Sequence, residues 1–373
     1  MRWGSVYRGI VRRIHPSSET AEIEISPNLK GSLHNRDVFA PGTERGSGIG
    51  KRLKTGQTVI VQAKESILSM RAGSDTNTLE IKSPRLTMHI GLQGRYLVYM
   101  PLAGENKVSQ RIRDKKLRRR LQDMMAGQIS MQGLILRSSA ADIQTDIIEK
   151  EAAVLHKQWD AIEKLSTGSG KHSAQLLQGP NAIQRLLSNL AEKPIERIEV
   201  VTLDHLEAVQ TWCRNFAPDI SPRIIPVEIS GATNDLRLFE HRDILKQIEA
   251  LFSAYTLLKG GGNLIIQETA ALTAIDINRG SDKQSNLNLN IHAAKEIARQ
   301  LRLRNIGGII VIDFLKMKSA ADEKKLKEAM TGYFDDDQCT VQLHGLTNLG
   351  LYELTRQQRT ASLQDRMKSV TLT

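Results

Sequence analysis

Two strongly apolar segments in the last third of the chain each carry one aspartate. Asp276 lies within Ala274–Asn278, and Asp313 lies near the end of Ile309–Phe314. Between them, the stretch Ile291–Arg304 has helical spacing and many basic residues. A strand–helix–strand order predicts parallel neighbouring strands joined by a right-handed crossover. Both aspartates are therefore expected near the carboxyl edge of one sheet, where open α/β sheets usually place their sites.

The pairing of these aspartates points to a metal ion. Neighbouring carboxylates repel unless a cation holds them, and oxygen ligands suit a hard ion such as Mg²⁺, with Mn²⁺ as a substitute. Asn278 lies two residues after Asp276, on the same strand face, where it can orient a water or a phosphate. We predict that Asp276 and Asp313 are metal ligands and that these two aspartates, together with Asn278, are catalytic. On spacing alone, the alternative is that each aspartate caps a loop at a strand end.

Composition limits the class of protein. The 373 residues are 40% hydrophobic and 25% charged, which predicts a globular chain of two to four domains. A formal net charge of +11 favours nucleic acid as a partner. No apolar run reaches membrane-spanning length, so no membrane association is expected. Cys213 and Cys339 form no Cys-x-x-Cys pair. Neither zinc nor a disulfide framework is therefore predicted, and a reducing, cytoplasmic location is expected.

Periodicity divides the chain into four parts. Residues 5–89 read as short strands broken by turns, as in a small OB-type barrel. Residues 90–178 combine strands with a long amphipathic helix, and residues 179–251 alternate helix and strand. Residues 252–363 hold the aspartate strands and an acidic turn at Asp335–Asp337, which is expected to be exposed.

Three segments resemble the catalytic core of the ribonuclease E/G family. They are Ala271–Asn278, Glu296–Phe314 and Gly350–Gln357, the last of which looks like the family's closing helix. The resemblance implies an endoribonuclease that cuts single-stranded RNA in RNA processing or decay and leaves 5′-phosphate ends. By the same resemblance, a metal-activated water attacks, Asp276 and Asp313 hold the magnesium, and Asn278 assists.

The resemblance also implies a multidomain α/β fold. Residues 5–89 correspond to an OB-type RNA-binding barrel and residues 90–178 to a 5′-sensor domain. Residues 179–251 correspond to an RNase H-like subdomain, expected without its N-terminal strands. Residues 252–363 correspond to a DNase I-like catalytic subdomain.

A 5′-phosphate pocket is expected in the sensor part. Gly94, Val98 and Arg137 stand where the family forms this pocket, and Ser138 replaces the usual threonine. A guanidinium and a hydroxyl can grip a terminal phosphate, and a glycine lets the backbone approach it. The alternative is an ordinary arginine at a strand end.

Clustered cations predict further contacts with RNA. In the basic run Lys107–Arg120, clustered cations gain affinity for phosphates by releasing counterions. The residues assigned to RNA binding are Lys82, Arg111, Arg113, Lys115 and Lys116. The alternative is that the run forms a solvated face.

Departures from the family leave other functions open. The family's Cys-x-x-Cys zinc link is absent, so a monomer, or a homodimer not formed through zinc, is expected. Ser32 stands where an aromatic residue is expected on the barrel's RNA face, and Phe39 and Tyr7 are the remaining candidates for stacking there. The alternative function is a catalytically weak or inactive RNA-binding protein that retains the ribonuclease scaffold. A third hypothesis is a structural subunit of an RNA-processing assembly.

Overall fold

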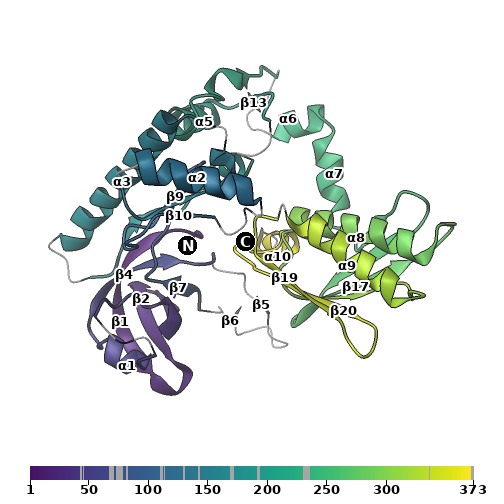
Figure 1. The fold of residues 1–373 in the computed structure, drawn as a ribbon, viewed down its shortest axis with the longest axis horizontal. Helices are drawn as coiled ribbons and strands as arrows, with labels where there is room; N and C mark the ends of the chain where they lie inside the picture. Colours follow the sequence, from purple (N-terminus) through teal and green to yellow (C-terminus); the bar gives the residue numbers. More distant parts are fainter. Residues whose placement is uncertain are drawn as a thin grey trace. The chain divides into compact units, whose positions relative to one another are not determined.

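The structure is a computed structural model that forms two compact units. One unit comprises Met1–Ile67 and Ser83–Leu238, and the other comprises Leu68–Lys82 and Phe239–Thr373. The residues that the structure describes are 1–42, 44, 46–66, 71–72, 79–80, 83–109, 112, 114–128, 131–141, 143–168, 172–190, 194–229, 236–335 and 337–370. Figure 1 labels many of the elements of both units.

A closed five-stranded barrel occupies the first part of the first unit. Its strands follow one another in the order β1-β2-β3-β7-β4, and antiparallel pairing of β1 with β4 closes the ring. Every second residue of β2 is buried, so the alternating pattern aims Ala21, Ile23 and Ile25 into the barrel. The predicted OB-type barrel is confirmed at this level. The strands are β1 (Val6–His15), β2 (Thr20–Ser26), β3 (Leu29–His34), β4 (Thr58–Ala63) and β7 (Arg85–Thr87), with helix α1 (Ile49–Arg52) before β4.

The rest of the first unit packs around the long helix α3 (Thr145–Thr167). Its buried residues recur every three or four positions, and they join one core with the strands and helices around them. A sheet in the order β10-β11-β9-β8 lies against α3, and β13 and β14 form a separate parallel pair. Strand β12 (Ala174–Leu177) pairs with β1 of the barrel. The other elements are β8 (Leu92–Gln93), β9 (Leu97–Tyr99), β10 (Lys107–Val108), α2 (Lys115–Gln128), β11 (Leu134–Leu136), α4 (Ala182–Asn189), β13 (Ile198–Val200), α5 (Leu203–Phe216) and β14 (Ile224–Pro226).

The second unit is built on a six-stranded mixed sheet. The strand order is β15-β16-β17-β18-β20-β19, and β17 and β18 are the parallel pair. Helices α8 and α9 cover one face of this sheet and share a single apolar core with it (Figure 1). The strands are β15 (Tyr255–Leu257), β16 (Asn263–Glu268), β17 (Leu272–Asn278), β18 (Gly308–Asp313), β19 (Val341–Leu346) and β20 (Tyr352–Arg356). The helices are α7 (Ile244–Ala250), α8 (Asn286–Leu303), α9 (Ala320–Asp335) and α10 (Leu363–Val370). Two short strands, β5 (Arg71–Ala72) and β6 (Leu79–Glu80), pair with each other, and α6 (Leu236–His241) spans the boundary of the units.

Two expectations about the end of the second unit are wrong. The predicted closing helix is strand β20, in which Tyr352, Leu354 and Arg356 are buried and the residues between them are not. This period of two is the pattern of a half-buried strand rather than of a helix. The acidic turn is not wholly exposed, because Asp337 is only 2% exposed. Its carboxylate accepts two hydrogen bonds from the buried Arg356 guanidinium, at 2.9 and 3.0 Å.

None of the helices in the described ranges is both long enough and apolar enough to cross a lipid bilayer.

Candidate active site

The two predicted aspartates lie directly opposite each other. In the parallel ladder of β17 and β18, Asp276 is the register partner of Asp313. Neighbouring strands are about 4.8 Å apart, so both side chains start from adjacent points on the same face. Both residues are exposed. The predicted strand–helix–strand unit therefore brings the two carboxylates together.

Asn278 is tied to the first aspartate. Its Nδ2 donates a hydrogen bond of 2.8 Å to Oδ2 of Asp276. A longer contact of 3.5 Å joins the same nitrogen to Oδ1 of Asn263, the cross-strand partner of Asn278 on β16. The amide thus holds one carboxylate oxygen in place and leaves the other oxygen to the open face of the sheet.

The segments that follow the two strands are anchored to helix α8. Asn290 is buried in α8, donates from Nδ2 to the carbonyl of Leu315 (2.8 Å) and accepts from its amide (3.0 Å). After β17, Arg279 donates to the backbone carbonyls of Asp282 (3.0 Å) and Gln284 (2.6 Å) and to Oδ1 of Asn286, the first residue of α8. Because both exits from the paired strands are held by hydrogen bonds, the site lies on a rigid part of the unit.

The paired carboxylates fit a hard cation that keeps part of its water shell. Mg²⁺ typically binds one or two carboxylates and several waters, rather than a cage made only of protein ligands. Across the described residues, no cluster of three or more histidines, cysteines, aspartates or glutamates could hold a metal. The assignment of magnesium to Asp276 and Asp313 stays a prediction at this point.

The predicted 5′-phosphate residues come together on the sheet of the first unit. Gly94 lies in the turn between β8 and β9, and Arg137 follows β11. Arg137 donates to the carbonyl of Gly94 (3.2 Å), and its own amide donates to the carbonyl of Tyr96 (2.9 Å). Val98 pairs across the sheet with Ile135, two positions before Arg137. Ser138 follows Arg137 directly, so the structure brings all four residues into one region.

A buried glutamate beneath this turn is a residue that the sequence analysis missed. Glu151 of α3 is 1% exposed, and its Oε1 accepts hydrogen bonds from the amides of Tyr96 (2.9 Å) and Leu97 (3.0 Å). A Cβ atom at Gly94 would lie 2.0 Å from this oxygen, so any other residue there would force the buried Glu151 side chain to move. Helical spacing from Ile148 and Leu155 places position 151 on the buried face, and that signal was available in the sequence.

Burial also changes the acidity of this glutamate. Desolvation raises the pKa of Glu151 from 4.5 to about 7, although the backbone hydrogen bonds and the nearby Arg137 oppose the shift. Its second oxygen, Oε2, has no hydrogen-bond partner among the residues that the structure describes. Glu151 therefore titrates near neutral pH while it supports the turn that carries Gly94.

The predicted RNA-binding cations are only partly described. Lys115 and Lys116 are exposed in the first turn of α2, where Asp114 Oδ1 accepts from the amide of Lys116 (2.8 Å) and helps to fix the start of the helix. Lys82, Arg111 and Arg113 lie outside the described residues.

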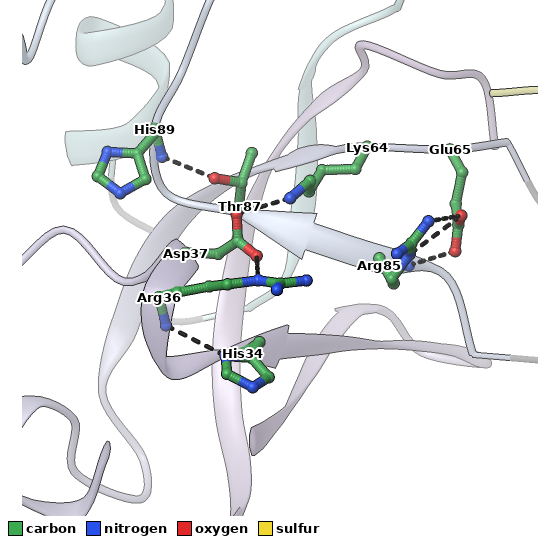
Figure 2. Close-up of polar contacts among 8 residues, drawn as sticks. All are labelled: His34, Arg36, Asp37, Lys64, Glu65, Arg85, Thr87 and His89. Carbon is green, nitrogen blue, oxygen red and sulfur yellow. Dashed lines mark hydrogen bonds and ion pairs between the residues drawn. The ribbon is translucent and has the colours of Figure 1, made fainter. Parts of the chain in front are cut away.

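The barrel carries a cluster of charged side chains and histidines at the ends of β3, β4 and β7 and in the residues that follow them (Figure 2). Asp37 accepts from Lys64 at 2.8 Å and lies 3.7 Å from Arg36, while Arg85 pairs with Glu65 at 3.1 Å. Three cations face two carboxylates, so these five residues carry a small positive excess. Nearby, Phe39 and His89 meet edge to face with ring centres 6.2 Å apart. Tyr7 is buried and does not serve as a stacking surface.

Comparisons with known proteins agree with the motifs and the geometry. Residues 91–359 match the Ribonuclease E/G family. The chain is 30% identical to Ribonuclease G of Escherichia coli strain K12, over 97% of this chain and 74% of that protein. It is 32% identical to Ribonuclease E of a Synechocystis species, over 97% of this chain and 53% of that protein. Ribonuclease E of a Nostoc species is also 32% identical, over 95% of this chain and 51% of that protein. The chain therefore belongs to the ribonuclease E/G family, which confirms the endoribonuclease class predicted from its sequence.

Proposed function

We propose that this chain is a Mg²⁺-dependent endoribonuclease that cuts single-stranded RNA and leaves 5′-phosphate ends. The observation that supports this most is the register of β17 and β18, which sets Asp276 opposite Asp313 on an exposed face. Two carboxylates so close would repel by about 1 kcal/mol even in water. A divalent cation bound between them would remove that repulsion and would explain why the two carboxylates are neighbours.

The side chains of the site divide the work. Asp276 and Asp313 would hold the cation, and Asn278 fixes the orientation of Asp276 through its 2.8 Å hydrogen bond. When bound, Mg²⁺ supplies positive charge opposite the developing charge on the phosphate and makes water a better nucleophile. Because Asn278 already holds one carboxylate oxygen, less reorganisation is needed when substrate arrives.

We propose that the first unit recognises the RNA. Arg137 and Ser138, beside the turn that carries Gly94 and with Val98 on the next strand, form the 5′-phosphate pocket. A guanidinium is suited to this task because it presents several donors in a fixed plane. Lys115, Lys116 and the barrel cluster would contact phosphates along the strand, so binding should weaken as salt rises.

A cleavage assay tests the proposal. The substrate is a 5′-phosphorylated single-stranded oligonucleotide, and kcat/KM is measured with and without Mg²⁺. Asp276→Asn and Asp313→Asn should each lower kcat by on the order of 100-fold or more, because an electrostatic contact to the transition state contributes about 3 kcal/mol. Glu323→Gln removes an exposed carboxylate from α9, on the helical side of the sheet, and should leave kcat unchanged.

The same assay separates the rival function. Undiminished cutting by both aspartate variants would refute the site. RNA binding without turnover by the unaltered chain, at any Mg²⁺ concentration, would instead favour the non-catalytic RNA-binding protein.

A further inference from the structure

Among the described residues, the side chains of β16, β17 and β18 that share a face with Asp276 are exposed or half-buried, and those on the other face form the core with α8 and α9. We call the first face the open face of the sheet. Thr256 of β15 accepts a hydrogen bond of 2.9 Å from Arg304, which ends α8, so Thr256 points to the helical side. Side chains alternate along a strand, and its neighbours Tyr255 and Leu257 therefore point to the opposite, open face. Asp276 and Asp313 lie on that same open face.

Tyr255 belongs to the same row of side chains as the two aspartates. Tyr255 is the register partner of Ile265, Ile265 is the partner of Asp276, and Asp276 is the partner of Asp313. With about 4.8 Å between strands, the backbone of Tyr255 lies about 10 Å from that of Asp276. The tyrosine ring is long enough to cover much of this gap above Ile265, which is half-buried.

This tyrosine is unusually exposed for a large aromatic residue. Its exposed fraction is 63%, and Phe252 is 43% exposed. In the part of the chain that the structure describes, these two are the aromatic residues among the exposed large hydrophobic side chains. The chain has only 4% aromatic residues, and both exposed ones lie in or just before β15, beside the row of the aspartates.

We propose that Tyr255 stacks on a nucleobase next to the scissile phosphate and so positions the RNA over Asp276 and Asp313. This inference rests on the proposed endoribonuclease function and adds the direction of the strand: RNA crosses the sheet from β15 towards β18. Stacking accepts any base, because every base has an aromatic face. Tyr255 therefore fixes where the strand lies without selecting a sequence.

The test combines protein variants with an abasic scan. Single-stranded oligonucleotides carry one abasic nucleotide at each position around a mapped cleavage site, and KM and kcat are measured for each. Tyr255→Ala should raise KM about 5- to 150-fold, the equivalent of 1–3 kcal/mol for one stacked base. Tyr255→Phe should behave like the unaltered chain, because stacking uses the ring and not the hydroxyl.

Two controls define the role. Leu349→Ala removes an even more exposed apolar side chain (87%) from the turn between β19 and β20 and should leave KM unchanged. At one position beside the cut, an abasic nucleotide should raise the KM of the unaltered chain by the same factor as Tyr255→Ala raises it for intact RNA. The same abasic nucleotide should not raise the KM of the Tyr255→Ala variant any further. Far-UV circular dichroism should show the same folded content in every variant.

The outcomes distinguish the inference from the function on which it rests. Equal KM values for Tyr255→Ala and the unaltered chain, or losses that simply add at every abasic position, would overturn the stacking role. If the unaltered chain does not cut RNA, the proposed function fails. The stacking inference is then tested by RNA binding, measured by fluorescence anisotropy: the losses of affinity from Tyr255→Ala and from an abasic nucleotide should not add at one position.

Discussion

The buried Glu151 makes a quantitative prediction about stability and pH. In the unfolded chain its pKa is near 4.5, and in the folded first unit desolvation raises it to about 7. Between these values the folded protein holds a proton that the unfolded chain has released. Stability therefore falls as pH rises through this window and becomes level above it.

The size of the effect follows from the shift. Each unit of pKa difference corresponds to about 1.4 kcal/mol, so ionisation of Glu151 should remove on the order of 3 kcal/mol of stability between pH 4.5 and pH 7. Glu151→Gln cannot ionise, yet its side-chain oxygen can still accept from the amides of Tyr96 and Leu97. The variant should match the unaltered chain near pH 4 and be more stable by up to about 3 kcal/mol at pH 8.

Urea unfolding followed by tryptophan fluorescence measures the stability of the first unit, which contains Glu151. The chain has three tryptophans, Trp3, Trp159 and Trp212, and all of them lie in the first unit. The free energy of unfolding is compared between variant and unaltered chain at each pH, which cancels the titration of other groups. Glu149→Gln, an exposed exchange on the same helix, should show no such pH-dependent difference.

Parallel curves for Glu151→Gln and the unaltered chain from pH 5 to pH 8 would refute the reasoning. They would mean that hydrogen bonding to the carboxylate offsets its desolvation completely.

Two further predictions concern packing. Gly94→Ala places a methyl group 2.0 Å from Glu151 Oε1, so it should destabilise the first unit by about 1–3 kcal/mol and reduce any preference for 5′-phosphorylated over 5′-hydroxyl RNA. Gly104→Ala has open space around it and should do neither. Asp337→Ala leaves the Arg356 guanidinium buried without its carboxylate and should lower the free energy of unfolding by about 3–5 kcal/mol, measured by chemical unfolding followed by circular dichroism. Arg299→Ala breaks an exposed pair with Glu296 and should lower it by under about 1 kcal/mol. A loss for Asp337→Ala no larger than that for Arg299→Ala would contradict the importance of the buried pair.

The central architecture of the second unit was predictable because hydrophobic pattern and connection rules both act locally. Apolar runs around Asp276 and Asp313 with a helix between them allow few arrangements other than a parallel pair. The exact register was not predictable. It depends on where β18 begins, and that start is at Gly308, whose φ of +90° other residues rarely adopt.

The errors have a physical reason in common. The segment Gly350–Gln357 was assigned by likeness to a family helix, although alternation of Tyr352 and Leu354 with polar residues indicates a strand. Asp337 was expected to be exposed because charged turns usually are, but its partner Arg356 lies on a strand that the sequence analysis had placed in a helix. A wrong element thus hid a buried ion pair, since only the strand turns Arg356 inward.

Glu151 shows a different limit. Its helix was predicted, and its position on the buried face follows from the spacing of Ile148 and Leu155. The sequence does not show that the amides of Tyr96 and Leu97, which lie far away along the chain, donate to this carboxylate. The acceptor was visible in the sequence, but its donors depend on tertiary packing.

The apolar neighbours of the two aspartates position the site as directly as the carboxylates themselves. Ile275 and Ile277 flank Asp276, Ile312 and Phe314 flank Asp313, and all four are buried in the core beneath α8 and α9. A slip of either strand by one residue would turn its aspartate into this core and expose its isoleucines. An unpaired carboxylate there is strongly unfavourable, so the same hydrophobic pattern that stabilises the unit also holds both carboxylates on the open face. The geometry of the proposed metal site is therefore a consequence of core packing.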